Sequence, residues 1–152
     1  MSRRIALSVV AGAVVLAGAG AFALAYAGDR DPAPALTHSA VHYTAPSSGR
    51  DGSLSFTTEV SAPSGVRSLK VLAWPEQSGF AKKQLTAEEM AAVESATCTP
   101  AGGHTVRCVY EAAVSAADAA SSPHGAWHVA VLATAKDGST ALDRRAADFT
   151  VR

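Results

Sequence analysis

Cys98 and Cys108 are the two cysteines of the chain and its first candidates for chemistry. Outside the cytoplasm a cysteine pair normally forms a disulfide, and Pro100 to Gly103 can turn the chain so that the sulfurs meet across a hairpin. A redox pair would use Cys-x-x-Cys spacing, and a single intervening His104 does not complete a zinc site. We therefore predict a structural disulfide, worth roughly 2.5–3 kcal/mol through loop closure.

The five histidines are the remaining candidates for catalysis or metal binding. His38 and His42 lie four residues apart in a predicted strand, which separates them by about 13 Å, too far for one metal ion. His104 and His124 fall in predicted turns, and His128 lies on the outer face of its strand. No Gly-x-Ser-x-Gly nucleophile elbow is present. We predict no catalytic residue, no metal and no cofactor, and therefore a protein that is not an enzyme.

Trp74-Pro75 and Phe80 form the candidate surface for binding a partner. Aromatic side chains near loops are effective anchors in protein interfaces. Core packing is the alternative for Trp74, and it is the expected place of Trp127.

The N-terminal segment decides where these residues would work. Ser2, Arg3 and Arg4 give a basic start, residues 5–26 carry no charge, and Ala25-Tyr26-Ala27 matches the small-x-small cleavage pattern. Residues 1–27 are therefore predicted to be a signal peptide, and the protein to be secreted or extracytoplasmic. The apolar run is about twenty residues long, enough to span a bilayer, so an uncleaved membrane anchor through residues 5–26 is the alternative.

The remaining chain reads as a linker over 28–36 and one folded domain over 37–152. Removal of the signal takes Arg3 and Arg4 from the 13 basic residues and keeps all 13 acidic ones, which leaves a net charge of −2. A nearly neutral domain without a basic stripe is not expected to bind nucleic acid.

Alternation of apolar and polar residues predicts a mostly β domain. Four segments show this period of two: residues 53–60, 66–74, 106–114 and 127–135. Pro63-Ser64-Gly65 separates the first two, which predicts that they form a hairpin. Asp137-Gly138 predicts a tight turn after the fourth segment, and Phe149 and Val151 should point inward from a final strand over 148–152.

One segment carries the signature of a helix. Thr86 and Glu89 form a capping box, and Leu85 and Met90 are spaced as a hydrophobic staple. The pattern predicts a short helix to about Ser95, inserted between strands and lying across the edge or end of a sheet. Its acidic residues, Glu88 and Glu94, read as a solvated face, with contact to a partner as the alternative.

The stretch from Gly125 to Gly138, in which Trp127 opens an alternating strand that ends in Asp-Gly, resembles the last hairpin of bacterial immunoglobulin-like and fibronectin-type domains. With the signal segment and the cysteine hairpin, the chain is similar to small secreted actinobacterial proteins of an uncharacterised domain family. The resemblance implies an all-β, immunoglobulin-like β-sandwich with a short helical insertion. The resemblance carries no activity to transfer. From the signal segment and the missing catalytic motifs we predict an exported, non-enzymatic binding or structural module of the cell envelope or medium, whose partner is an unidentified protein or envelope component.

A second resemblance supplies the alternative function. Cys98-Thr99-Pro100 with Gly103-His104 and Cys108 is similar to a disulfide hairpin of the secreted subtilisin-inhibitor family, which would make the chain a protease inhibitor. The chain departs from that family in having no second cysteine pair, a shorter hairpin, and Thr105 where the family has a proline.

Overall fold

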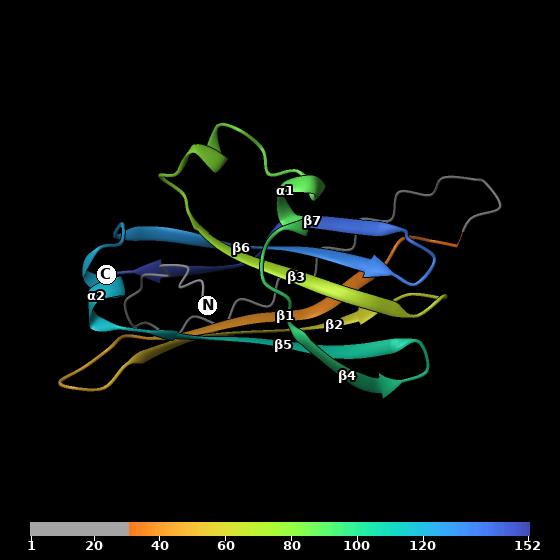
Figure 1. The fold of residues 1–152 in the computed structure, drawn as a ribbon, viewed down its shortest axis with the longest axis horizontal. Coiled ribbons are helices and arrows are strands. Elements are labelled where there is room, and N and C mark those ends of the chain that lie inside the picture. The colour runs from red at the N-terminus through yellow and green to blue at the C-terminus, as the bar shows by residue number, and fades with distance from the viewer. Residues whose placement is uncertain (1–30) are drawn as a thin grey trace.

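The computed structural model describes residues 31–152, which fold as two antiparallel β-sheets packed face to face (Figure 1). The predicted signal segment 1–27 and residues 28–30 of the predicted linker lie outside the described residues. The four-stranded sheet consists, in spatial order, of β1 (Ala35–Thr44), β2 (Gly52–Ser61), β5 (Thr105–Val114) and β4 (Thr97–Gly102). The three-stranded sheet consists of β3 (Val66–Pro75), β6 (Gly125–Ala135) and β7 (Thr140–Val151). The prediction of an all-β sandwich is confirmed.

The predicted hairpin between 53–60 and 66–74 is wrong. β2 pairs with β1 and β5, whereas β3 pairs with β6 in the other sheet. The turn at Ala62–Gly65 carries the chain from one sheet to the other, with a left-handed Gly65 (φ +90°) and a hydrogen bond from its N–H to the carbonyl of Ala62. Alternation identifies the inward face of a strand but not its partner, and both sheets offer an inward face.

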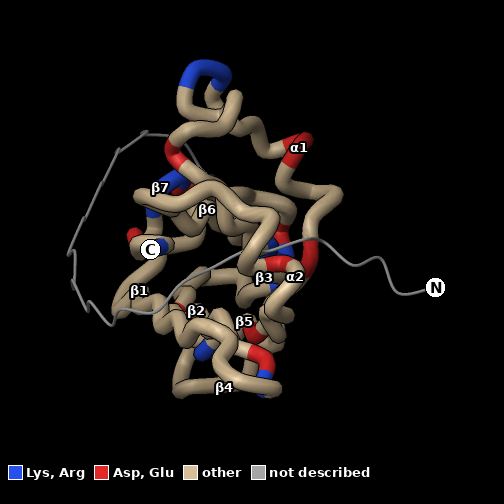
Figure 2. The backbone as a smooth tube through the Cα atoms, turned by 90° about the vertical axis from the view of Figure 1, so that its left-hand side faces the viewer, with Lys and Arg blue, Asp and Glu red and all other residues tan. Residues whose placement is uncertain are grey.

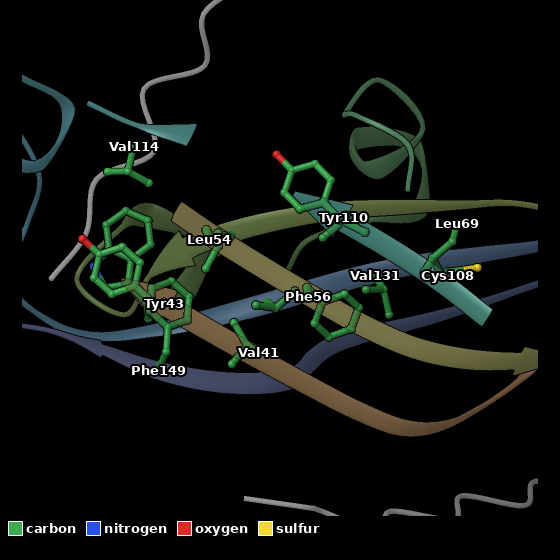
Figure 3. Packing of buried hydrophobic residues seen from close by; sticks show 14 of the residues in the cluster. Val41, Tyr43, Leu54, Phe56, Leu69, Cys108, Tyr110, Val114, Val131 and Phe149 are labelled. Atoms are coloured by element: carbon green, nitrogen blue, oxygen red, sulfur yellow. The ribbon is translucent and has the colours of Figure 1, made fainter. Parts of the chain in front are cut away.

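The inner core fills the space between the two sheets. Phe56 and Val60 of β2 and Val131 of β6 are each 0% exposed. Figure 3 shows Phe56 and Val131 close together between the sheets and Tyr43 beside Phe149. The ring centroids of Tyr43 and Phe149 are 6.1 Å apart. Burying one such apolar side chain contributes about 1.5–3 kcal/mol relative to leaving it exposed, so this core is the main source of the fold's stability.

β6 is buried on both faces, although its sequence predicted one buried face. Ala130 and Leu132 point away from the inner core and are nevertheless 0% and 4% exposed. Residues 76–96, which connect β3 to β4 and are called the insertion below, fold back over this outer face. Together they form an outer cluster of Trp74, Leu85, Met90, Ala130 and Leu132, with Leu72, Val93 and Leu142 packed against it. Figure 2 shows the resulting three layers end-on: insertion, three-stranded sheet, four-stranded sheet.

The predicted helix is present but shorter and differently placed. α1 (Ala87–Ala91) begins at the predicted capping box of Thr86 and Glu89. It contacts β3 and β6 over the outer face, not across an edge or end of the sheet. It ends early because residues 93–96 pair with the free edge of β3, where the N–H of Val71 donates to the carbonyl of Glu94. A one-turn helix, η1 (Gly79–Ala81), precedes α1 in the insertion.

A second helix was not predicted. α2 (Ala116–Ala120) connects β5 to β6 and begins at a capping box of Ser115 and Asp118. The Ser-x-x-Asp spacing was visible in the sequence, but no apolar periodicity accompanied it.

The ends of the domain also differ from the prediction. Ala35 and Leu36, which the sequence placed in the linker, pair with β2, and a bulge follows at His38 (φ 54°). β7 is a twelve-residue strand that starts at Thr140, and Phe149 and Val151 point inward as predicted. Within residues 31–152, no helix is both long and apolar enough to cross a membrane.

Candidate functional site

The predicted disulfide is present and structural. Cys98 of β4 and Cys108 of β5 are direct cross-strand partners with Cα atoms 4.0 Å apart, and Cys108 is fully buried. Thr99 and Pro100 pair with β5, and the chain reverses at Gly102 and Gly103. The segment between the cysteines is thus a closed hairpin, without the extended loop that a substrate-like inhibitor presents to a protease.

The histidines do not gather into one site. His38 and His42 are exposed on β1, and Nδ1 of His38 lies 3.1 Å from the carboxylate of Glu59. His104 is exposed in the turn between β4 and β5, and His124 is exposed in the connection that precedes β6. In the described part of the chain, no three His, Cys, Asp or Glu side chains lie close enough together to hold a metal ion.

His128 is the exception among the histidines, because it is only 3% exposed. Its ring is on the outer face of β6, as the sequence indicated, but Trp74 covers it at a centroid distance of 4.6 Å. Nδ1 donates to the carboxylate of Asp148 at 2.5 Å. Nε2 lies 3.8 Å from Oε1 of Glu76 and has no hydrogen-bond partner among residues 31–152. Sequence reasoning missed this environment, since the covering residues are distant in the chain.

Tyr110 and Glu94 form a second polar contact, where the insertion meets β5. The tyrosine hydroxyl donates to Oε2 of Glu94 at 2.8 Å. Burial, and then the hydrogen bond to Glu94, raise the pKa of Tyr110 above its ordinary value. A polar surface hollow of about 560 Å³ lies beside this pair. Glu94, predicted as part of a solvated helical face, is therefore tied to the four-stranded sheet.

The structure brings together the two aromatic residues that the sequence proposed for partner binding. Trp74 is 4% exposed and Phe80, from η1, is 36% exposed. Their rings meet edge to face with centroids 6.5 Å apart. Trp74 thus packs in the outer cluster and supports Phe80 from below, so Phe80 alone presents substantial aromatic surface.

A pocket of about 280 Å³ opens beside Phe80, between the insertion and β7. Trp74, Phe80 and Leu85 supply apolar walls, and Arg144 and Arg145 of β7 supply charge. The guanidinium of Arg145 lies 5.9 Å from the Trp74 ring centre, an arrangement in which a cation is attracted to an aromatic face. Sequence reasoning missed both arginines, because their contribution depends on how the insertion folds over the sheet. We call this the Phe80 pocket.

The backbone of this region holds the pocket in shape. The indole N–H of Trp74 donates to the carbonyl of Arg144 at 3.2 Å, and Nε of Arg144 donates to the carbonyl of Leu85 at 2.8 Å. The first bond links β3 to β7, and the second links β7 to the insertion. The loop that precedes α1 carries Lys82 and Lys83 and shows blue at the top of Figure 2.

Comparison with known proteins gives one match. A family of unknown function, DUF5707, matches residues 36–133, which is more than half of the chain and reaches from β1 into β6. No curated protein matches the chain, and neither does any solved structure. The chain therefore belongs to the family of unknown function DUF5707.

Proposed function

We propose that this protein is an exported, non-enzymatic binding module of the cell envelope or extracellular medium, built on an immunoglobulin-like β-sandwich. The strand order supports the fold assignment. The sheets β1-β2-β5-β4 and β3-β6-β7 correspond to the A-B-E-D and C-F-G sheets of seven-stranded immunoglobulin domains. Those domains bind through surfaces carried on a rigid sandwich.

Export is supported by two independent features. Disulfides persist in oxidising compartments and are rare in the cytosol, and both cysteines of this chain are committed to one. The basic start, uncharged run and Ala-x-Ala pattern of residues 1–27 are typical of a signal peptide.

The proposal that the protein is not an enzyme is supported by the low accessibility of its buried histidine to a substrate. His128 and Asp148 form a hydrogen-bonded acid–base pair. Its imidazole is buried under Trp74 and therefore does not face a cleft that a substrate could enter. Catalytic general bases must come within hydrogen-bond reach of the proton that they abstract.

The observation that carries the binding role is the Phe80 pocket. It combines an exposed aromatic ring, two guanidinium groups and apolar walls at one place on the surface. Aromatic residues and arginine are the side chains most enriched at energetically important interface positions. In the closed arrangement of the insertion, hydrogen bonds join Trp74 to Arg144 and Arg144 to Leu85 beneath this surface.

The test uses the full chain expressed in an actinobacterial secretion host. Intact mass of the medium and membrane fractions should identify a processed species two hydrogens lighter than the reduced chain. The purified protein is then sedimented with isolated envelopes of that host over a range of concentrations. Phe80→Ser should weaken retention about tenfold or more, whereas Ala101→Ser on the exposed β4–β5 hairpin should not change it. Retention that is absent, or equal for both variants, would contradict the proposal.

A further inference from the structure

The Phe80 pocket has a size and charge that restrict what it can hold. Its volume of about 280 Å³ lies just below the range of about 300–1,000 Å³ found for pockets that enclose drug-sized ligands. It is therefore suited to one or two side chains of a larger partner. Of the residues that line it, two are arginines and none is acidic.

Both guanidinium groups are held before any ligand arrives. Arg144 uses Nε to bind the carbonyl of Leu85, which leaves its two Nη groups outside that bond. Arg145 lies against the Trp74 ring, with Nη2 3.7 Å from Oε1 of Glu76. Ordering long side chains in advance removes part of the entropy cost of binding. A planar guanidinium offers parallel N–H donors that match the two oxygens of a carboxylate.

The surroundings favour a peptide over a long polyanion. The mature chain has a net charge of −2 by sequence, which opposes broad attraction to polyanions. Oε1 of Glu76 lies 3.7 Å from Nη2 of Arg145, and Oδ1 of Asp143 accepts the backbone N–H of Arg145. These two carboxylates would repel a second row of negative charges. Next to the arginines, Phe80 and Leu85 provide apolar contact for a neighbouring side chain.

We propose that the Phe80 pocket binds an acidic side chain of a partner protein, with the carboxylate on Arg144 and Arg145 and an adjacent apolar residue against Phe80. The proposal rests on the binding role above and names the ligand chemistry of that site. The partner segment is short and exposed, and in it a Glu or Asp lies next to an apolar residue.

The NMR signals of the two tryptophan indole N–H groups can distinguish binding at the pocket from a change elsewhere in the protein. The chain has two tryptophans. The indole N–H of Trp74 bonds the carbonyl of Arg144 at the pocket, whereas that of Trp127 bonds the carbonyl of Pro123 beside the inner core. An end-capped pentapeptide centred on Glu-Leu is titrated into ¹⁵N-labelled protein, and the matched Gln-Leu peptide and inorganic phosphate are titrated separately.

The expected result is a saturable shift of the Trp74 indole with the Glu-Leu peptide and no shift of Trp127. Arg144→Gln and Arg145→Gln should each weaken binding about tenfold or more, and Arg107→Gln on β5 should leave it unchanged. Arg145→Gln leaves the Leu85 contact intact, so it remains informative if Arg144→Gln loosens the insertion.

Three results would overturn the ligand assignment: no Trp74 shift, an equal response to the Gln-Leu peptide, or phosphate binding as tightly as the Glu-Leu peptide. If envelope retention still depends on Phe80 in any of these cases, the binding role stands and only the ligand class is wrong. If envelope retention also fails, both proposals fall.

Discussion

The three-stranded sheet separates two hydrophobic clusters of different character. On its inner side, the core is closed by a second complete sheet, and the hairpin at the far edge of that sheet is cross-linked by Cys98–Cys108. On its outer side, the cluster is closed only by the insertion, which contributes one helix of five residues and one of three. The same sheet thus supports a fully enclosed core and a partly open one.

The polar contacts also differ between the inner and outer sides of the three-stranded sheet. The outer side contains the buried His128, whose Nε2 has no partner within the described chain, and it opens into the Phe80 pocket. The insertion is tied to the sheet by a few long-range bonds, among them Ala96 N–H to Leu69 and Arg144 to Leu85. Regions with few buried contacts open at lower free energy than cores do. We infer that the sandwich is the scaffold and the insertion a separately opening unit that carries the binding surface.

The largest expected effect comes from a matched pair of leucines, each 1% exposed. Leu54→Ala in the inner core should lower the global free energy of unfolding by about 3–5 kcal/mol, the cost of a cavity in a closed core. Leu85→Ala in the outer cluster should cost about 1–2 kcal/mol globally, because the insertion can detach without unfolding the sheets. Urea denaturation measures both. Equal losses would mean that the insertion and sandwich unfold as one unit.

Removal of the disulfide should act on the scaffold alone. Cys98→Ala with Cys108→Ala should lower the global free energy of unfolding by roughly 2.5–3 kcal/mol, since the unfolded chain gains loop entropy. Amide exchange in α1 should change little. α1 contacts the outer face of the three-stranded sheet, whereas β4 and β5, which carry the two cysteines, lie in the other sheet (Figure 2). Faster exchange in α1 together with the sandwich would argue against separate units.

Alkaline pH should weaken the inner core through its tyrosines. Burial raises the pKa of Tyr43 and Tyr110 in the folded state, so folding favours their neutral forms. Their contribution is complete below the ordinary tyrosine pKa of about 10. It is lost as pH rises from there toward the raised folded-state pKa, by about 1.4 kcal/mol per pH unit for each tyrosine.

Denaturation at several pH values above neutrality measures this slope. Tyr43→Phe should make the loss less steep. It should also cost little at pH 7, because the Tyr43 hydroxyl is buried without a hydrogen-bond partner in residues 31–152. An unchanged slope in this variant would show that the phenol does not titrate with unfolding.

The smallest effect concerns the helix cap of the insertion. Thr86→Ala removes the side chain that accepts the N–H of Glu89, at a cost of about 1 kcal/mol. The cost should appear as faster amide exchange in α1, with the global midpoint nearly unchanged. Ser115→Ala removes the corresponding cap of α2 and should leave exchange in α1 as it was. A full shift of the global midpoint by Thr86→Ala would contradict the account.

Features encoded by nearby residues were predictable from the sequence. Each of these features depends on spacings within one element or one turn. They are the capping box at Thr86, the disulfide across a short hairpin, and the inward faces of the strands around Cys108 and Val131. Trp74 and Phe80, which the sequence proposed together, are in contact because they lie six residues apart at a strand end; their binding of a partner stays a prediction.

Features that depend on distant segments were not predictable in the same way. Alternation could not assign β2 and β3 to different sheets, because it contains no information about partners. The burial of His128 and the participation of Arg144 and Arg145 depend on where residues 76–96 fold. The aromatic residues of the candidate site could therefore be proposed from the sequence, whereas its two arginines could not.

Native-state hydrogen exchange of the full chain tests the central claim most directly. The account predicts that the amides of Met90, Ala92 and Ala96, which bond within or from the insertion, exchange through local opening at a clearly lower free energy than the amides of Val129 and Val131 in β6. The β6 amides should exchange only through global unfolding. If all five amides exchanged at the same free energy, the insertion would be an integral part of the scaffold, and the distinction between the two sides of the sheet would be wrong.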